Sequence, residues 1–335
     1  MVSRIQPPVP KEPRDRCEVN WIEETHPETI AANASKGQVR WDPIHSFWNG
    51  GMALAAVALV PFYTTPSGVA VGLGLTGLML LLGHSVGFHR LLIHSSFETT
   101  PWLRRFLLWC GTVAGMSGPL WIVRTHDIRD WAQRQEECHD YLAHRRPMLI
   151  DALWQLHCTL ILDRPPRYDL SALEQSATIR WLERTWMLHQ IPLAAALYAI
   201  GGPPFVVWGV FVRVALTVHG HWLVGHLAHR RGPQSWHVRG AGVQAHDVPW
   251  AGLITMGEAW HNNHHAYPGS ARIGLHPGQS DPGYAFIAVL ERLGLAWNVC
   301  LPSDLAARQS KLVAAGVCAA PQEEAPIPSK KTALS

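Results

Sequence analysis

The chain has 335 residues and a net charge of +3, and only 16% of its residues are charged, against about 25% in ordinary soluble domains. The small charge, without a basic stretch interleaved with aromatic residues, argues against a nucleic-acid partner. The six cysteines form no CxxC pair, so the sequence predicts neither a rubredoxin-like iron centre nor a disulfide framework, and electrons for any redox chemistry must come from a separate donor.

The first 45 residues carry mixed charge and lack the apolar core of a cleaved signal peptide, which predicts a soluble N-terminal arm. No Asp, Glu, Lys or Arg then occurs from Phe47 to Leu82, and the run Thr64-Thr65-Pro66-Ser67-Gly68 divides this stretch in two. A membrane-spanning helix needs about 17–25 residues. The pattern therefore predicts a hairpin of two spans, 47–63 and 67–86.

The uncharged run from Phe106 to Val123 is long enough for a further span, but a span here would place the histidines before and after it on opposite membrane faces. Its glycines and the Gly118-Pro119 pair favour a re-entrant or interfacial segment.

A second uncharged region, Trp186 to Val212, is broken by Gly201-Gly202-Pro203-Pro204 and predicts spans 186–201 and 203–222. Arg213 lies in the last span, where its charge is costly unless the side chain snorkels toward the interface or finds a partner, and we expect it to snorkel. Nearly all Lys and Arg lie outside the hairpin turns, so the positive-inside rule predicts both termini on the cytoplasmic side. The predicted fold is an all-α integral membrane protein: four transmembrane helices in two hairpins, a membrane domain over 46–300 with a cytoplasmic helical cap (87–185 and 223–300), and a partly disordered tail (301–335).

Histidines cluster on the predicted cytoplasmic side. His261, His264 and His265 have the spacing of one helical face, which suits a metal site, although a solvated turn has the same spacing. His89 and His94 are five residues apart and diverge by about 140° on an α-helix. They converge only if the helix ends, kinks or meets ligands from elsewhere. His84, one step nearer the bilayer, is interpreted as support.

Three sequence motifs contain or flank these histidines. They are the box His89-Arg90-Leu91-Leu92-Ile93-His94, then Trp222-Leu223-Val224 leading to His229, then Gly257-Glu258-Ala259-Trp260-His261-Asn262 running into His264-His265-Ala266-Tyr267-Pro268. In this order, and over roughly residues 41–300, the chain resembles the integral-membrane fatty acyl desaturases of the stearoyl-CoA type.

The resemblance implies an oxygen-dependent desaturase that removes two hydrogens from a long acyl chain carried by coenzyme A or by a lipid. It implies two non-haem iron ions and a separate electron donor of the cytochrome b5 or ferredoxin type. The metal ligands carried over are His89, His94, His126, His229, His261, His264 and His265. Imidazole-ligated iron with open positions suits such chemistry, whereas zinc has no redox chemistry.

The second histidine box departs from the family. Where two further histidines are expected after His126, this chain has Arg129 and Asp130. Asp130 lies on the same helical face as His126, so we expect its carboxylate to replace one imidazole as a ligand. Arg129 is always cationic and is a candidate, with Arg145 and Arg146, for binding an anionic headgroup.

Downstream, His139 and His144 repeat the five-residue spacing and are candidate substitute ligands, although a solvated turn is an equal alternative. The family also has an asparagine three residues after Trp222, where this chain has Gly225. The adjacent His226 is a candidate to take over its role.

Three alternatives remain open on sequence alone. A related membrane lipid hydroxylase would use the same centre. A non-catalytic member that has lost full two-metal binding would explain the altered second box. A histidine-rich transporter is disfavoured, because the predicted spans contain no acidic residue that could relay ions.

Overall fold

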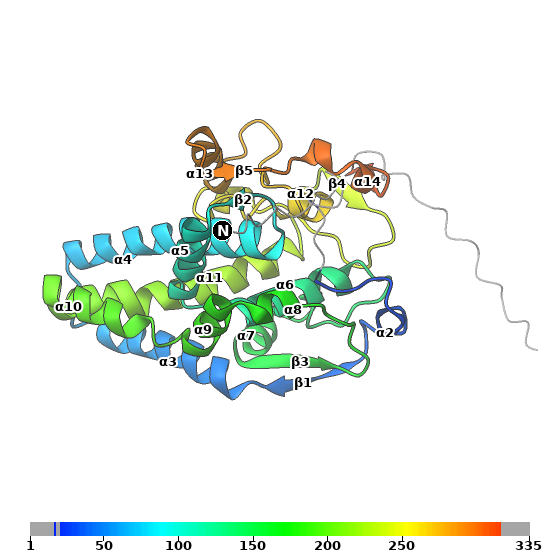
Figure 1. The fold of residues 1–335 in the computed structure, drawn as a ribbon. Coiled ribbons are helices and arrows are strands. Elements are labelled where there is room, and N and C mark those ends of the chain that lie inside the picture. The colour runs from blue at the N-terminus through cyan, green and yellow to red at the C-terminus, as the bar shows by residue number, and fades with distance from the viewer. Residues whose placement is uncertain (1–16, 18–20, 316–335) are drawn as a thin grey trace, which may run out of the picture.

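The computed structural model describes Cys17 and residues 21–315, and most of these residues lie in helices. Long helices form one end of the molecule, and short helices, strands and loops form the other (Figure 1). The helices are α2 (Pro27–Ile30), α3 (Pro43–Leu59), α4 (Pro66–Leu78), η1 (Met79–Ile93), α5 (Pro101–Val113), α6 (Pro119–Gln133), α7 (Met148–His157), α8 (Ser171–Gln175), α9 (Ala177–Thr185), α10 (Gln190–Val206), η2 (Val207–Val212), α11 (Arg213–Ala228), η3 (Pro249–Ala251), α12 (His261–Ala266), α13 (Pro282–Arg292), η4 (Pro302–Asp304) and α14 (Ala306–Gln309). The strands are β1 (Gly37–Trp41), β2 (Glu98–Thr99), β3 (Cys158–Leu162), β4 (Trp236–Val238), β5 (Ala296–Trp297) and β6 (Leu312–Ala314).

Helices fill the regions that the sequence predicts to span a membrane. Two helical runs, Pro66–Ile93 and Gln190–Ala228, are long and apolar enough to cross a bilayer. Within the second run the backbone leaves the helical region at Gly202, with φ 66° and ψ −158°. The chain then folds back, since a Cβ at Gly209 would lie only 2.6 Å from Cδ1 of Leu197. The turn is therefore where the glycine-proline run predicts it.

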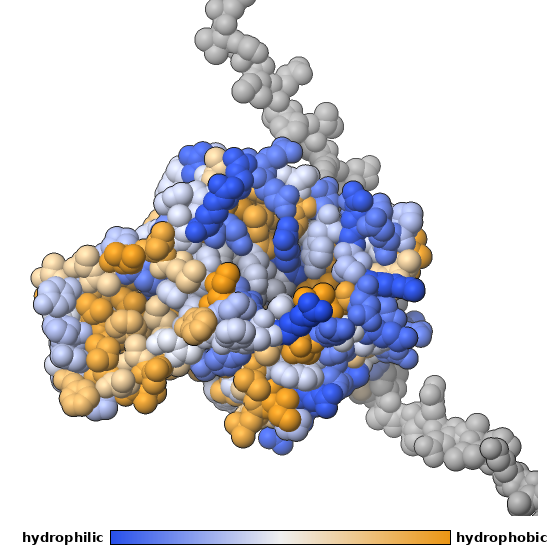
Figure 2. All heavy atoms as spheres, turned by 90° about the horizontal axis from the view of Figure 1, so that it is seen from below, coloured by the Kyte–Doolittle hydropathy of each residue, from blue (hydrophilic) through white to orange (hydrophobic). Residues whose placement is uncertain are grey.

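Apolar side chains gather on the surface at the end formed by α3, α4 and α10 (Figure 2). Each of the following side chains is more than half exposed: Leu54, Val57, Leu73, Tyr198 and Ile200. Exposed apolar patches of this kind mark surfaces that another apolar phase covers. Together with the long apolar helices, this surface is typical of a membrane protein.

Arg213 does not snorkel, and that expectation is wrong. Its side chain is fully buried and donates to the carbonyl oxygens of Gly209 at 2.7 Å and Val113 at 2.8 Å, and to the side chain of Gln190. The carbonyl of Val113 belongs to the last turn of α5, where helix carbonyls lack partners and carry partial negative charge. The cation is therefore satisfied inside the protein.

The helix η1 packs on α5 at nearly backbone contact. A Cβ at Gly83 would lie 2.5 Å from the carbonyl oxygen of Cys110, and one at Gly87 would lie 2.5 Å from that of Leu107. Any side chain at either glycine would force the two helices apart. This close approach fixes the position of the histidines that follow on η1.

Short antiparallel strands tie the two ends of the described chain to its middle, so the all-α expectation needs correction. β1 pairs with β3 from Gly37 opposite Leu162 to Trp41 opposite Cys158, β2 pairs with β5, and β4 pairs with β6. A disulfide joins Cys17 to Cys300 across 283 residues, a separation from which no sequence spacing could have revealed it. The predicted disorder of the tail falls at residues 316–335, outside the described part of the chain.

Candidate metal centre

Four histidines from three helices come together in one group. His89 and His94 lie at the end of η1, His126 is on α6 and His264 is on α12. One ring nitrogen from each lies within 4.8 Å of the others. The sequence names all four as candidate ligands, and the fold brings them to one place.

The convergence of His89 and His94 follows from the type of helix. From Met79 to Ile93 the helix is a π-helix, whose hydrogen bonds join residues five apart, and the amide of His94 donates to the carbonyl of His89 at 3.1 Å. Residues five apart therefore lie nearly over one another, and the ring centroids of His89 and His94 are 4.8 Å apart. The ring of His84 lies 6.3 Å from that of His89, but it lies outside the group of four.

The group presents ring nitrogens that are free to bind a ligand. Among the described residues, Nε2 of His94, Nδ1 of His126 and both nitrogens of His264 are buried without a hydrogen-bond partner. Such atoms are costly unless something binds them. Burial, reinforced by the neighbouring imidazoles, lowers the pKa of His94 and His264 well below the usual range. These rings are therefore neutral, the form that binds metals.

The carboxylate of Asp130 faces this group. Its Oδ2 lies 3.9 Å from Nδ1 of His126 and 4.0 Å from Nε2 of His264. Burial opposes ionisation of Asp130, but His126, His265 and His94 hold its pKa below the usual range. Burial alone would lower the pKa of His126, yet the acidic neighbours Asp130 and Asp127 raise it. The site thus contains one anionic oxygen donor among imidazoles.

A second group consists of His229, which follows α11, and His261 and His265 of α12, with ring nitrogens within 4.8 Å of one another. Nε2 of His261 and Nε2 of His265 are 3.1 Å apart. Nδ1 of His229 lies 2.7 Å from the carbonyl oxygen of Gly225, and its Nε2 lies 3.1 Å from Oε1 of Gln133. Burial lowers the pKa of His229 and His261 well below the usual range.

The two groups lie side by side because α12 contributes to both. The ring centroid of His264 is 5.6 Å from that of His261 and 5.7 Å from that of His265. The alternative of a solvated turn for this box is therefore excluded, since His264 is 1% exposed and its neighbours face other imidazoles.

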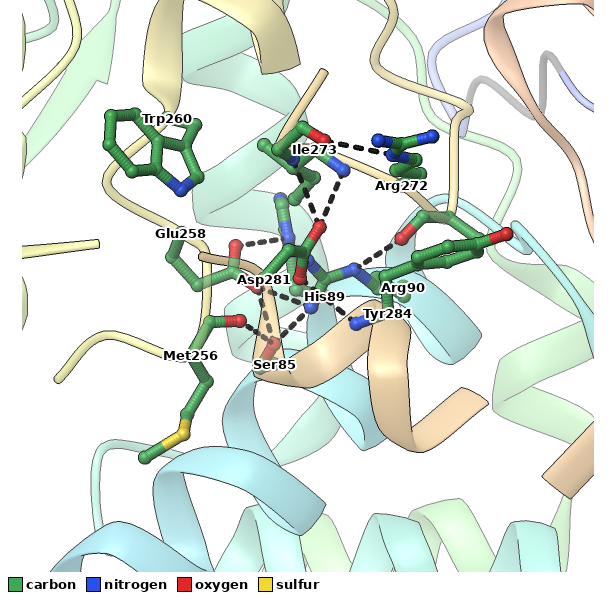
Figure 3. Close-up of polar contacts among 12 residues, drawn as sticks. Ser85, His89, Arg90, Met256, Glu258, Trp260, Arg272, Ile273, Asp281 and Tyr284 are labelled. Atoms are coloured by element: carbon green, nitrogen blue, oxygen red, sulfur yellow. Dashed lines mark hydrogen bonds and ion pairs between the residues drawn. The ribbon is translucent and has the colours of Figure 1, made fainter. Parts of the chain in front are cut away.

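A buried polar network supports the first group (Figure 3). Oε2 of Glu258 lies 2.6 Å from Nδ1 of His89, and Oε1 accepts hydrogen bonds from Ser85 at 2.6 Å and from Arg90 at 2.9 Å. Arg90 also contacts Asp281 at 2.8 Å. A carboxylate on Nδ1 fixes the ring and leaves Nε2 free, as around many metal-bound histidines.

Sequence reasoning missed the roles of Glu258 and Asp281. Glu258 lies three residues before His261, within a sequence motif that resembles the family, and this position is the only sequence feature that points to it. No sequence feature points to Asp281, because its ion pair with Arg90 forms only when the chain folds.

A third cluster lies next to the second group. Oδ2 of Asp151 lies 2.9 Å from Nδ1 of His144 and 2.8 Å from Nδ1 of His226, and it accepts a hydrogen bond from Trp222 at 2.9 Å. His139 is not part of any of the three clusters. Its Nδ1 accepts a hydrogen bond from the backbone amide of Tyr141.

The three candidate headgroup arginines are all engaged with the protein. Arg129 donates to Gln155 at 2.7 Å, Arg145 to the carbonyl of Gly242 at 3.0 Å, and Arg146 forms an ion pair with Asp140 at 3.1 Å. Their predicted part in headgroup binding stays a prediction.

A cavity of about 440 Å³ opens beside the histidine clusters. Apolar side chains of α6, α7 and α11 line much of it, among them Ile122, Leu156 and Val218. His144 and Gly225 also line it, so the cavity reaches the residues that contact the second group. Its size lies in the range of small-molecule sites.

Comparisons with known proteins agree with this geometry. Residues 64–276 match the family model described as fatty acid desaturase. The chain is 33% identical to the sn-1 stearoyl-lipid 9-desaturase of Anabaena variabilis over 81% of this chain and 97% of the relative. It is 34% identical to an acyl-CoA 5-desaturase of Anemone leveillei over 80% and 82%. It is also 34% identical to the chloroplastic palmitoyl-monogalactosyldiacylglycerol delta-7 desaturase of Arabidopsis thaliana over 73% and 66%.

The family match covers the segments that carry both histidine groups. The chain therefore belongs to the fatty acid desaturase family and is an acyl desaturase, an oxidoreductase.

Proposed function

We propose that this protein introduces a double bond into a long acyl chain in an oxygen-dependent reaction at two iron ions. The first iron is held by His89, His94, His126 and His264 with Asp130, and the second by His229, His261 and His265. The observation that carries the proposal is the pair of adjacent, buried or partly buried imidazole groups, to both of which α12 contributes. Neutral imidazole with a carboxylate is a donor set that suits iron.

When bound, iron supplies the oxygen-activating redox chemistry that an unactivated methylene pair requires. The chain's own residues have other tasks. Glu258 and Arg90 hold the ring of His89, so that Nε2 faces the first group. Asp130 balances charge among neutral ligands. The apolar lining of the cavity excludes water and aligns an acyl chain beside the site.

The substrate carrier is proposed to be coenzyme A or a glycerolipid, since the relatives include both acyl-CoA and acyl-lipid desaturases. Oxygen is the second substrate, and electrons arrive from a separate protein of the cytochrome b5 or ferredoxin type. This dependence is supported by the lack of a CxxC iron motif in the chain.

For the membrane arrangement we propose four spans over the domain 46–300, with both termini and the histidine cap in the cytoplasm. Support comes from the helices at the predicted positions, the exposed apolar end and the placement of Lys and Arg away from the hairpin turns.

Expression in a host that lacks its own desaturase tests the function. We expect new monounsaturated acyl chains with the wild type and none with His264→Ala, which removes a ring that faces both groups. A host whose acyl chains stay saturated, with the protein present in its membranes and a reducing partner supplied, would overturn the proposal. Hydroxylated chains would identify the related hydroxylase reaction instead.

A further inference from the structure

His144 is a buried imidazole with one nitrogen held and the other free. Its side chain is 1% exposed, and its Nδ1 lies 2.9 Å from Oδ2 of Asp151. Among the described residues its Nε2 is buried without a hydrogen-bond partner. Because the carboxylate takes the proton-bearing Nδ1, Nε2 carries a lone pair. A buried lone pair without a partner is unfavourable unless a cation or a donor meets it.

This ring lies directly against the second histidine group. The rings of His144 and His229 are parallel within 13°, with centroids 5.2 Å apart. Nε2 of His144 lies over Gly225, where a Cβ would be only 3.7 Å away. Gly225 is also the residue whose carbonyl holds Nδ1 of His229. His144 and His229 therefore lie side by side next to Gly225, and Nε2 of His229 also lies 3.1 Å from Oε1 of Gln133.

The backbone holds His144 in an unfavourable conformation. Its φ is +51°, in the left-handed region that a residue with a side chain rarely adopts. Arg230, which follows His229, donates to the carbonyl oxygens of His144 at 3.3 Å and Arg145 at 2.8 Å. The contact ties the His144 segment to the residues after α11. Strain of this kind persists where the surrounding structure requires one orientation.

Asp151 holds the side chain of His144 in place. Its side chain is fully buried, and the same oxygen that faces His144 accepts from Nε1 of Trp222 and faces Nδ1 of His226. The indole N–H of Trp222 can only donate, so this oxygen of Asp151 is an acceptor held by residues of α11. Distances of 2.8–2.9 Å to three nitrogens are those of hydrogen bonds around one acceptor. The cluster is therefore a support for His144.

We infer that His144 is the fourth protein ligand of the second metal site, beside His229, His261 and His265, and that Asp151 is its positioning residue. The inference rests on the proposed function. With His144 the second site has four imidazoles, although Arg129 replaces one of the histidines expected in the second histidine box. The first group has four histidines, with Asp130 about 4 Å from two of them, whereas the second group has three histidines without His144.

Iron content of the full-length protein, purified in detergent and measured per chain with Mössbauer spectra, tests the assignment. We expect two irons in the wild type and about one in His144→Ala, with the second restored by free imidazole in the buffer. Asp151→Asn should weaken binding of the second iron by about 10–100-fold in a chelator titration. The matched control is His139→Ala, which changes the other histidine of the same spacing and should retain two irons.

If His144→Ala does not elute as a folded protein, His144→Gln takes its place, because it preserves volume and lacks the imidazole. Two irons with unchanged Mössbauer parameters in the His144 variant would overturn the inference, and so would loss of both irons. A wild type that binds no iron would instead overturn the proposed function, so the two failures are distinguishable.

Discussion

At the scale of single residues, the state of each imidazole is set by its hydrogen-bond partners. Glu258 occupies Nδ1 of His89, and the carbonyl of Gly225 occupies Nδ1 of His229. In both residues a neighbouring oxygen holds Nδ1 and so fixes the ring, and Nε2 of His229 also lies 3.1 Å from Oε1 of Gln133.

Glu258→Gln tests the support of the first site. The substitution keeps the shape but removes the charge that faces His89 and Arg90. We expect iron at this site to be bound about 10–100-fold more weakly, measured by competition with a chelator. Glu291→Gln, on an exposed position of α13, is the control and should bind like the wild type. Equal affinities in the two variants would contradict the role of Glu258.

Asp130→Ala tests whether a carboxylate has replaced a box histidine. Asp130 lies about 4 Å from two rings of the first group, so its loss should lower iron affinity at least about tenfold and reduce desaturation. Asp130→Glu should retain more of both than Asp130→Ala. The exposed Asp163→Ala serves as the control. Full activity in Asp130→Ala would show that the carboxylate is dispensable.

Much of the site could be predicted from residue spacing and family resemblance: the histidines at 89, 94, 126, 229, 261, 264 and 265 all lie in one of the two groups. The contribution of Asp151 could not, because it lies in an apolar helix, seven residues from His144, and acts only through contacts made on folding. Arg213 was misjudged for the same reason, since its acceptors come from α5.

At the scale of elements, the π-helix η1 determines the first site. The five-residue spacing of His84, His89 and His94 matches the hydrogen bonds of this helix type, whereas an α-helix would separate the rings. Sequence reasoning assumed α-helical geometry, because long π-helices are rare. The glycines of η1 then bring it into close contact with α5.

Gly87→Ala tests this packing. The new methyl group would meet the carbonyl oxygens of Leu107 at 2.5 Å and Leu82 at 2.8 Å, so η1 must shift. We expect a loss of about 1–3 kcal/mol in stability and lower iron content. In Gly74→Ala, on α4, nothing lies within 4 Å of the new atom, and stability should be unchanged or slightly higher. Thermal unfolding in detergent compares the two, and equal melting temperatures would refute the packing argument.

At the scale of the whole molecule, an apolar end and a histidine-rich end face different surroundings. The exposed apolar side chains of α3, α4 and α10 suit lipid (Figure 2), and α12, which carries His261, His264 and His265, lies away from that end of the molecule (Figure 1). Hydropathy predicted this division because it depends on composition alone. The disulfide and the strand pairings depend on distant partners and were not predictable.

The buried histidines should make the metal-free protein sensitive to acid. Burial lowers the pKa of His144 and His265 to about 4, against about 6.5 in the unfolded chain. Between these values the unfolded chain binds more protons, so stability falls as the pH drops from about 6.5 to 4. Each such histidine contributes about 1 kcal/mol per pH unit.

We expect the melting temperature of the metal-free protein to fall steeply from pH 7 to pH 5, whereas the iron-loaded protein should resist until protons displace the metal. A melting temperature independent of pH over this range would contradict the neutral, buried state of these rings.

The most direct test of the central claim is the metal content of the purified wild-type protein, measured per chain with iron and zinc counted separately. The two histidine groups predict two non-haem irons in each chain. A single zinc ion, or no metal after loading with ferrous iron, would contradict the account.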